Sequence, residues 1–158
     1  MMKVAIIDDE RDMRLSISQW LSLSGYEPES FASAEDALAQ IGSNYPGVVV
    51  SDIKMPGMDG MQFLKKLMGQ DSALPVILIT GHGDVPMAVE AMRLGAFNFL
   101  EKPFEPEELT HLIKSAVHKR SLTMENRELR QELSDGSKII KKLAGSSKIM
   151  LKLKEDIS

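Results

Sequence analysis

The first three-quarters of the chain alternate between short apolar runs and amphipathic segments. Three strongly apolar runs predict buried strands: Val4–Asp8, Val48–Asp52 and Pro75–Thr80. Glu27–Ala32 predicts a weaker strand, and Phe97–Lys102 predicts the last one. After each strand, apolar residues recur three and four positions apart, which predicts an amphipathic helix. The pattern is therefore five strand–helix units in a row.

The predicted helices also have recognisable ends. Ser33 and Asp59 are expected to cap the second and third helices, because their side-chain oxygens can accept amide hydrogens of the first turn. Gly25 and Gly95 end the first and fourth helices, and the fourth covers Val85–Leu94. The apolar faces of the other helices are predicted to carry Met13, Ile17, Trp20 and Leu21; Ala34, Ala37, Leu38 and Ile41; Phe63, Leu64, Leu67 and Met68; and Leu109, Leu112, Ile113, Ala116 and Val117.

This alternation predicts an α/β fold in which helices cover both faces of a parallel sheet. The first, third and fourth strands are apolar on both faces and should be central, whereas Glu29 and Ser30 mark the second strand as an edge. We therefore expect a flavodoxin-like, doubly wound five-stranded sheet of order 2-1-3-4-5, followed by a C-terminal helical extension. Ligands of such sheets bind beyond the carboxyl ends of the strands.

Polar side chains stand at those carboxyl ends; they are Asp8, Asp9, Asp52, Thr80 and Lys102. Three carboxylates converging from two adjacent strands repel one another unless a cation neutralises them. Oxygen ligands without His or Cys favour Mg²⁺, so we expect a magnesium site.

A metal ion, a lysine and a threonine hydroxyl around one carboxylate would form a pocket for a phosphoryl group. Asp52 is then a candidate nucleophile, and its product would be an acyl phosphate. Taken singly, each residue has a plainer interpretation, since a strand-end Asp is usually a cap and a strand-end Thr or Lys is usually structural. Their joint placement at four strand ends favours a site.

Four motifs, IIDDE, VVVSDIKMPGMDG, VILITGHGD and FNFLEKPF, occur in this order. They resemble the signatures of two-component response-regulator receiver domains, over roughly residues 1–120. The resemblance implies the CheY-like form of the fold, with a sensor histidine kinase as the phosphoryl donor. It also implies a phosphoacceptor with slow self-dephosphorylation, and not an enzyme with a separate substrate.

By position, the resemblance implies that Asp52 is the phosphoacceptor. Asp9 looks like the direct Mg²⁺ ligand, Asp8 like a ligand acting partly through water, and the backbone carbonyl of Lys54 like a further ligand.

The remaining motif positions imply a switch. Thr80 resembles the switch hydroxyl, Phe99 the coupled aromatic residue and Lys102 the lysine that pairs with the phosphate. A cis peptide bond is expected before Pro103. Because Phe99 has no hydroxyl, its part in the switch must be one of packing.

Composition limits the number of domains, the cellular compartment and the kinds of partner to be expected. The chain has 158 residues, a net charge of −4 and no cysteine, which fits one domain plus an extension in a reducing cytoplasm. Its start is already strand-like, so no signal peptide is expected. No apolar run approaches the roughly 18 residues of a membrane span. A mildly acidic chain is also a poor candidate for direct nucleic-acid binding.

From Ser121 the sequence changes character and apolar residues follow a heptad. Leu122, Leu129 and Leu143 occupy d positions, and Asn126, Leu133 and Ile140 occupy a positions. A single Asn at a typically fixes the register of a two-stranded coiled coil, which predicts a homodimer. The alternative is a plain solvated helix, and Gly136 is expected to interrupt the pattern.

The stretch Leu143–Leu153 resembles the entry to the ATPase domain of NtrC-type σ54-dependent activators. We therefore predict a receiver at residues 1–120, a coiled-coil linker at 121–143 and the start of an ATPase domain at 144–158. The predicted function is phosphorylation-dependent control of transcription through ATPase and DNA-binding domains absent from this chain. Two alternatives are a stand-alone receiver that acts by protein binding and a Mg²⁺-dependent phosphohydrolase.

Overall fold

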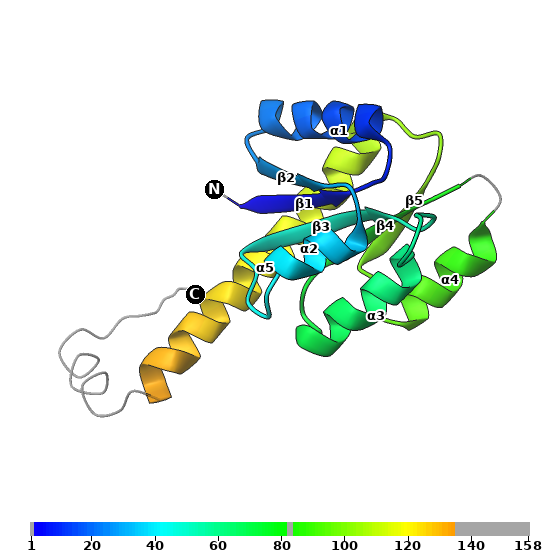
Figure 1. Ribbon diagram of the computed structural model, residues 1–158. Helices are drawn as coiled ribbons and strands as arrows, with labels where there is room; N and C mark the ends of the chain where they lie inside the picture. Colours follow the sequence, from blue (N-terminus) through cyan, green and yellow to red (C-terminus); the bar gives the residue numbers. More distant parts are fainter. Residues whose placement is uncertain (1, 82–83, 135–158) are drawn as a thin grey trace. The chain divides into compact units, whose positions relative to one another are not determined.

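The computed structural model describes residues 2–81 and 84–134. Five strands alternate with five helices, as the sequence predicts (Figure 1). Strand ends differ from the predicted ones by at most one residue; Asp8, for example, lies just beyond its strand. The elements are β1 (Lys3–Ile7), α1 (Arg11–Leu23), β2 (Glu27–Phe31), α2 (Ala34–Gln40), β3 (Gly47–Asp52), α3 (Gly60–Gln70), β4 (Val76–Thr80), α4 (Val85–Arg93), β5 (Asn98–Glu101) and α5 (Pro106–Ser134).

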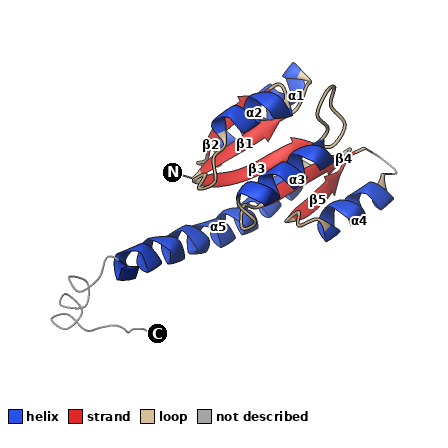
Figure 2. Cartoon of the chain, turned by 60° about the horizontal axis from the view of Figure 1, so that its bottom comes forward, coloured by secondary structure: helices blue, strands red, loops and turns tan. Residues whose placement is uncertain are grey.

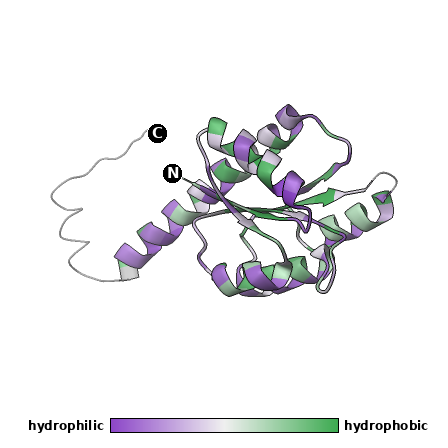
Figure 3. Ribbon diagram, turned by 45° about the horizontal axis from the view of Figure 1, so that its top comes forward, coloured by the Kyte–Doolittle hydropathy of each residue, from purple (hydrophilic) through white to green (hydrophobic). Residues whose placement is uncertain are grey.

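The strands form one parallel sheet of order β2-β1-β3-β4-β5, which confirms the predicted topology (Figure 2). Helices α1 and α5 supply apolar residues to the core on one face, and α2, α3 and α4 supply the core on the other. Figure 3 shows this layering, with the hydrophobic sheet between the helices. The central strands can be apolar on both sides only because both faces are covered.

Alternate side chains of each strand enter opposite cores. In β1, Val4 and Ile6 join the core under α1 and α5, whereas Ala5 and Ile7 join the core under α2 and α3. All six residues of β3 are buried, including Asp52 at its end. An acidic residue therefore closes a strand that is buried along its whole length.

The predicted helix ends are confirmed. Ser33 Oγ accepts the Asp36 amide at 3.1 Å, and Asp59 forms a reciprocal capping box with Gln62. Gly25 and Gly95 adopt φ values of +91° and +114° directly after the first and fourth helices, a conformation that favours glycine. These local signals set where each helix starts and stops.

Helix α5 is longer than the core it covers. Leu109, Ile113 and Ala116 are buried, and the helix then continues to Ser134. The chain divides into two compact units, Met1–Ser121 and Leu122–Ser158. Within the second unit, Leu122, Leu129 and Leu133 are exposed. The predicted heptad positions Gly136, Ile140 and Leu143 and the predicted ATPase start lie outside the described residues.

No helix in the described part of the chain is both long enough and apolar enough to cross a membrane.

Candidate functional site

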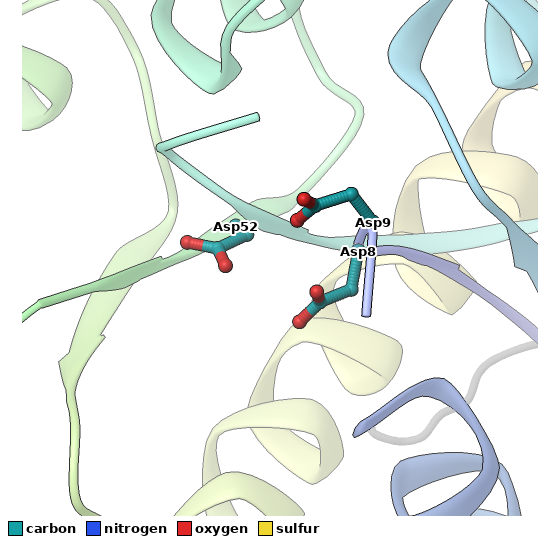
Figure 4. Close-up of side chains that lie close together, drawn as sticks. All are labelled: Asp8, Asp9 and Asp52. Carbon is teal, nitrogen blue, oxygen red and sulfur yellow. The ribbon is translucent and has the colours of Figure 1, made fainter. Parts of the chain in front are cut away.

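The carboxyl edge of the sheet brings the predicted acidic residues together. Strands β1 and β3 are hydrogen-bonded neighbours, with Ile7 opposite Ser51, so Asp8 and Asp9 emerge beside Asp52. One carboxylate oxygen from each of the three aspartates lies within 4.8 Å of the others. Figure 4 shows the three side chains meeting from the two strand ends. This spacing fits oxygen ligands around one small cation.

The effect of placing these carboxylates together is seen at Asp8. Its side chain is buried, and burial raises the pKa of its carboxyl above the usual value of 3.8. The amide of Glu10, which donates to Asp8 Oδ1 at 2.9 Å, opposes that shift, while the charge of Asp52 adds to it. Asp8 Oδ2 is buried and has no hydrogen-bond partner among the described residues. A buried carboxylate oxygen without a donor is what a bound cation would satisfy, so these residues fit Mg²⁺.

Lys102 offsets part of the negative charge. Its ammonium group lies 3.0 Å from Asp52 Oδ2, in an ion pair that is partly buried. Burial opposes the charge on Lys102, but the hydrogen bond and the charge of Asp52 outweigh it, so the pKa of Lys102 is raised. The predicted phosphate partner is thus charged and already beside the candidate nucleophile.

Thr80 lies on β4, the strand next to Asp52, and Phe99 lies on β5, one strand further along the sheet. Thr80 ends β4 and is buried, and its carbonyl accepts the amide of Lys102 at 2.9 Å. Phe99 is half-buried on β5, opposite Leu78. The peptide bond between Lys102 and Pro103 is cis, as expected. The structure therefore places all the predicted strand-end residues at one edge.

Lys54 has a contact that the sequence did not suggest. Its Nζ lies 3.3 Å from Asp84 Oδ2, so the loop after β3 is joined to the start of α4. Asp84 occupies the N-cap position of α4, yet its side chain makes no cap hydrogen bond. A cap role is the usual inference for an Asp before a helix, and only the tertiary structure shows its partner. The predicted Lys54 carbonyl ligand stays a prediction.

Gly60 is a second residue that the sequence analysis missed. A Cβ atom there would lie 2.5 Å from the Asp52 carbonyl oxygen and 2.7 Å from Ile53 Cα. Only glycine therefore lets the first turn of α3 approach the strand end that carries Asp52. The glycine follows the capping residue Asp59, and that local signal explained only the helix start.

The sheet order and the residues at its carboxyl edge are those of the class of receiver domains. The model of the response regulator receiver domain family matches residues 4–114, so the chain belongs to that family. The identification made from the four motifs is confirmed.

Similar proteins narrow the type of receiver. The C4-dicarboxylate transport transcriptional regulatory protein DctD of Rhizobium meliloti is 44% identical over 154 residues, which cover 98% of this chain and 33% of that protein. DctD of Pseudomonas aeruginosa is 45% identical over 155 residues, covering 98% and 34%. Among solved structures, NtrX from Brucella abortus matches with a TM-score of 0.73 and 36% identity, over 82% of this chain and 30% of that chain.

The chain spans about a third of the length of these two curated relatives. Its receiver is of the NtrC and DctD type, which agrees with the resemblance to NtrC-type activators stated from the sequence.

The raised pKa of Asp8 gives a test of the site without metal. The folded protein keeps the Asp8 proton to a higher pH than the unfolded chain does, so stability is lost as pH rises from about 3.8 through the folded pKa. Above the folded pKa, Asp8 is ionised in both states, so its effect on the free energy of unfolding no longer changes with pH. Urea unfolding with a chelator present, at a series of pH values, should show this loss in the wild type but not in Asp8→Asn.

Asp12→Asn, on the neighbouring helix, is the matched control. The difference between the wild type and Asp8→Asn should depend on pH in this window. A difference that is the same at every pH would contradict the buried, proton-retaining carboxyl.

Proposed function

We propose that this chain is the phosphorylation-dependent receiver of a two-component transcriptional regulator, with Asp52 as its phosphoacceptor. The observation that carries the proposal is the Asp52 side chain, which is paired with Lys102 at 3.0 Å and lies within 4.8 Å of Asp8 and Asp9. A sensor histidine kinase would donate the phosphoryl group. Family membership supports the same function.

In the proposed reaction, a carboxylate oxygen of Asp52 attacks phosphorus in the phosphohistidine of the kinase. The P–O bond of an acyl phosphate forms, the P–N bond breaks, and the imidazole leaves with the bonding electrons. Lys102 exchanges part of its pairing with Asp52 for a phosphoryl oxygen, because its charge is already at that position. The buried strand end holds Asp52 in line, which lowers the entropic cost of attack.

Asp8, Asp9, Asp52 and the Lys54 carbonyl would hold Mg²⁺. When bound, the ion would neutralise charge on the phosphoryl oxygens. Family membership supports a phosphoacceptor with slow self-dephosphorylation. That choice favours a receiver over the phosphohydrolase alternative.

The switch proposal concerns Thr80 and Phe99. A phosphoryl group on Asp52 would draw the Thr80 hydroxyl toward it, and Phe99 would pack into the vacated space. Thr80 lies on β4 beside the Asp52 strand, and Phe99 lies on β5, which pairs with β4; α4 follows β4 along the chain and α5 follows β5. The result would be a shift in a two-state equilibrium of the α4 face.

Control of an output domain is proposed from the relatives. We infer that the receiver acts on a σ54-activating ATPase and a DNA-binding domain beyond this chain, as part of a regulator of C4-dicarboxylate transport in the cytoplasm. The proposed boundaries are residues 1–120, 121–143 and 144–158. A stand-alone receiver that binds a partner protein is the alternative.

We also propose that the chain forms a homodimer through α5. Leu122, Asn126, Leu129 and Leu133 would form the seam of a two-stranded coiled coil. The three leucines are more than half exposed in the single chain, so each has apolar area to bury against a partner. Phosphorylation would act by rearranging this dimer.

Phosphorylation with acetyl phosphate tests the chemistry. Intact mass should show the addition of one phosphoryl group that requires Mg²⁺, and Asp52→Asn should show none. Lys102→Met should react about 10- to 150-fold more slowly, since a charge-assisted hydrogen bond contributes about 1.5–3 kcal/mol. Asp59→Asn, which retains a capping side chain, is the control and should react like the wild type; full phosphorylation of Asp52→Asn would refute the assignment.

The switch is tested with Thr80→Ala and the control Thr80→Ser, which keeps the hydroxyl. Both should accept the phosphoryl group. Sedimentation velocity should show a phosphorylation-dependent change of dimerisation in the wild type and Thr80→Ser, and its loss in Thr80→Ala. A wild-type response in Thr80→Ala means that the hydroxyl does not carry the coupling.

Leu129→Asp tests the seam. A carboxylate buried in a coiled-coil core is strongly unfavourable, so this variant should be monomeric at concentrations where the wild type is dimeric. Gln131→Asp adds the same charge at an exposed position outside the predicted seam and should remain dimeric. A monomeric wild type, or a dimeric Leu129→Asp, would end the coiled-coil proposal.

A further inference from the structure

Helix α5 carries a fully buried arginine at the end of its apolar stripe. Leu109, Ile113 and Ala116 lie on one face of the helix, and Arg120 is the next residue on that face. Arg120 is 0% exposed and is the largest side chain among the fully buried residues. Arginine is almost never fully buried unless it is paired, so its position calls for an explanation.

The guanidinium of Arg120 joins three segments. Its Nε and Nη2 donate to the Tyr45 carbonyl at 3.1 and 2.8 Å, and Nη2 also donates to Asp71 Oδ2 at 2.8 Å. Tyr45 lies in the connection before β3, and Asp71 ends α3 in the connection before β4. These contacts are at the edge of the sheet opposite Asp52.

The cluster is costly as a source of stability alone. Arg120 Nη1 is buried and has no hydrogen-bond partner among the described residues. Buried ion pairs are often replaceable by apolar residues with no loss of stability. A leucine at this position would continue the stripe but could not bind Tyr45 and Asp71. The arginine therefore supplies a directional attachment in place of a purely apolar one.

The spacing of the proposed seam residues from Arg120 can be expressed as angles around an ideal helix. At about 100° per residue, Leu122, Asn126, Leu129 and Leu133 fall between about 180° and 240° around the helix axis from Arg120. Arg120 is also close to the end of the first compact unit, which runs to Ser121. Whatever fixes the rotation of α5 at Arg120 also fixes the direction in which the seam starts.

We propose that Arg120 is a positioning residue that anchors α5 in its last turn before the linker and thereby fixes the rotation at which the seam leaves the receiver. Without the side chain, the nearest fully buried residue of α5 is Ala116, about 6 Å earlier along the axis. The helix could then bend or rotate between Ala116 and Leu122. The regulatory importance of this anchor rests on the dimer function proposed above, but its structural effect does not.

The test measures the junction within one chain. The protein has no cysteine, so Lys66→Cys and Glu132→Cys can carry one spin-label pair between receiver and linker. A second pair, Lys66→Cys and His111→Cys, lies wholly within the receiver. Labelled chains are mixed with excess unlabelled chain, so that electron–electron distances are measured within a chain whether or not it dimerises or is phosphorylated.

The variants are Arg120→Ala, Asp71→Ala and the control Lys114→Ala, which removes an exposed cation from the same helix. Samples are labelled and equilibrated well below their melting temperatures before being frozen for measurement. The wild type and Lys114→Ala should give one narrow distance peak for the receiver–linker pair. Arg120→Ala and Asp71→Ala should lose that single peak and give a broad distribution, while the receiver pair stays narrow in every variant.

Two results would overturn the proposal. If Arg120→Ala keeps the narrow receiver–linker peak, the side chain does not fix the junction. If the receiver pair broadens as well, Arg120 holds the whole domain together and has no specific role at the linker. Failure of the proposed function would instead appear as absent phosphorylation or a monomeric wild type, which this measurement does not require.

Discussion

Repulsion among three carboxylates is the constraint on which the rest of this structure depends. Asp8, Asp9 and Asp52 are held within 4.8 Å although like charges at that distance oppose one another. The sheet can impose this arrangement because β1 and β3 are paired strands whose side chains are locked into two cores. The strand pairing fixes the backbone positions from which the carboxylates project, so their side chains can separate only by rotating. The carboxyl edge of the sheet therefore favours bound positive charge, and Lys102 supplies only part of it.

The two lysines near Asp52 also connect the site to the elements around it. Lys102 follows β5, and its amide is bonded to the carbonyl of Thr80 at the end of β4. A change in charge at Asp52 therefore acts on two neighbouring strand ends at once. Lys54 extends the connection to α4 through Asp84. These contacts are short and local, so the proposed switch needs no long chain of intermediates.

Much of the fold could be predicted because it follows from patterns within short stretches of the sequence. Alternating strands and helices, apolar central strands and glycines after helices specify a doubly wound sheet, and the strand-end rule then places Asp8, Asp52, Thr80 and Lys102 together. The contacts of Arg120 could not be predicted, because Tyr45 and Asp71 are 75 and 49 residues away in sequence. In a helical pattern Arg120 looks like an ordinary surface cation, and only its burial shows otherwise.

The heptad of α5 is a different case, because its apolar residues are exposed. Leu122, Leu129 and Leu133 are apolar residues that a single chain leaves in water. Their spacing shows that they share a face, and Asn126 at an a position favours a second copy of this helix as the partner. A heptad can be predicted because it repeats along one element, whereas the contacts of a single buried residue such as Arg120 leave no repeat in the sequence.

The close approach at Gly60 has a mechanical consequence for the site. With no room for even one methyl group between the start of α3 and the Asp52 strand end, that side of the pocket is a stiff wall. On the other side, α4 begins at Asp84, whose side chain pairs with Lys54 and makes no cap hydrogen bond. The two sides of the pocket are therefore built differently, one from backbone in direct contact and the other from a side-chain ion pair. Backbone in contact has to move as a whole, whereas an ion pair at the surface can exchange its partners with solvent.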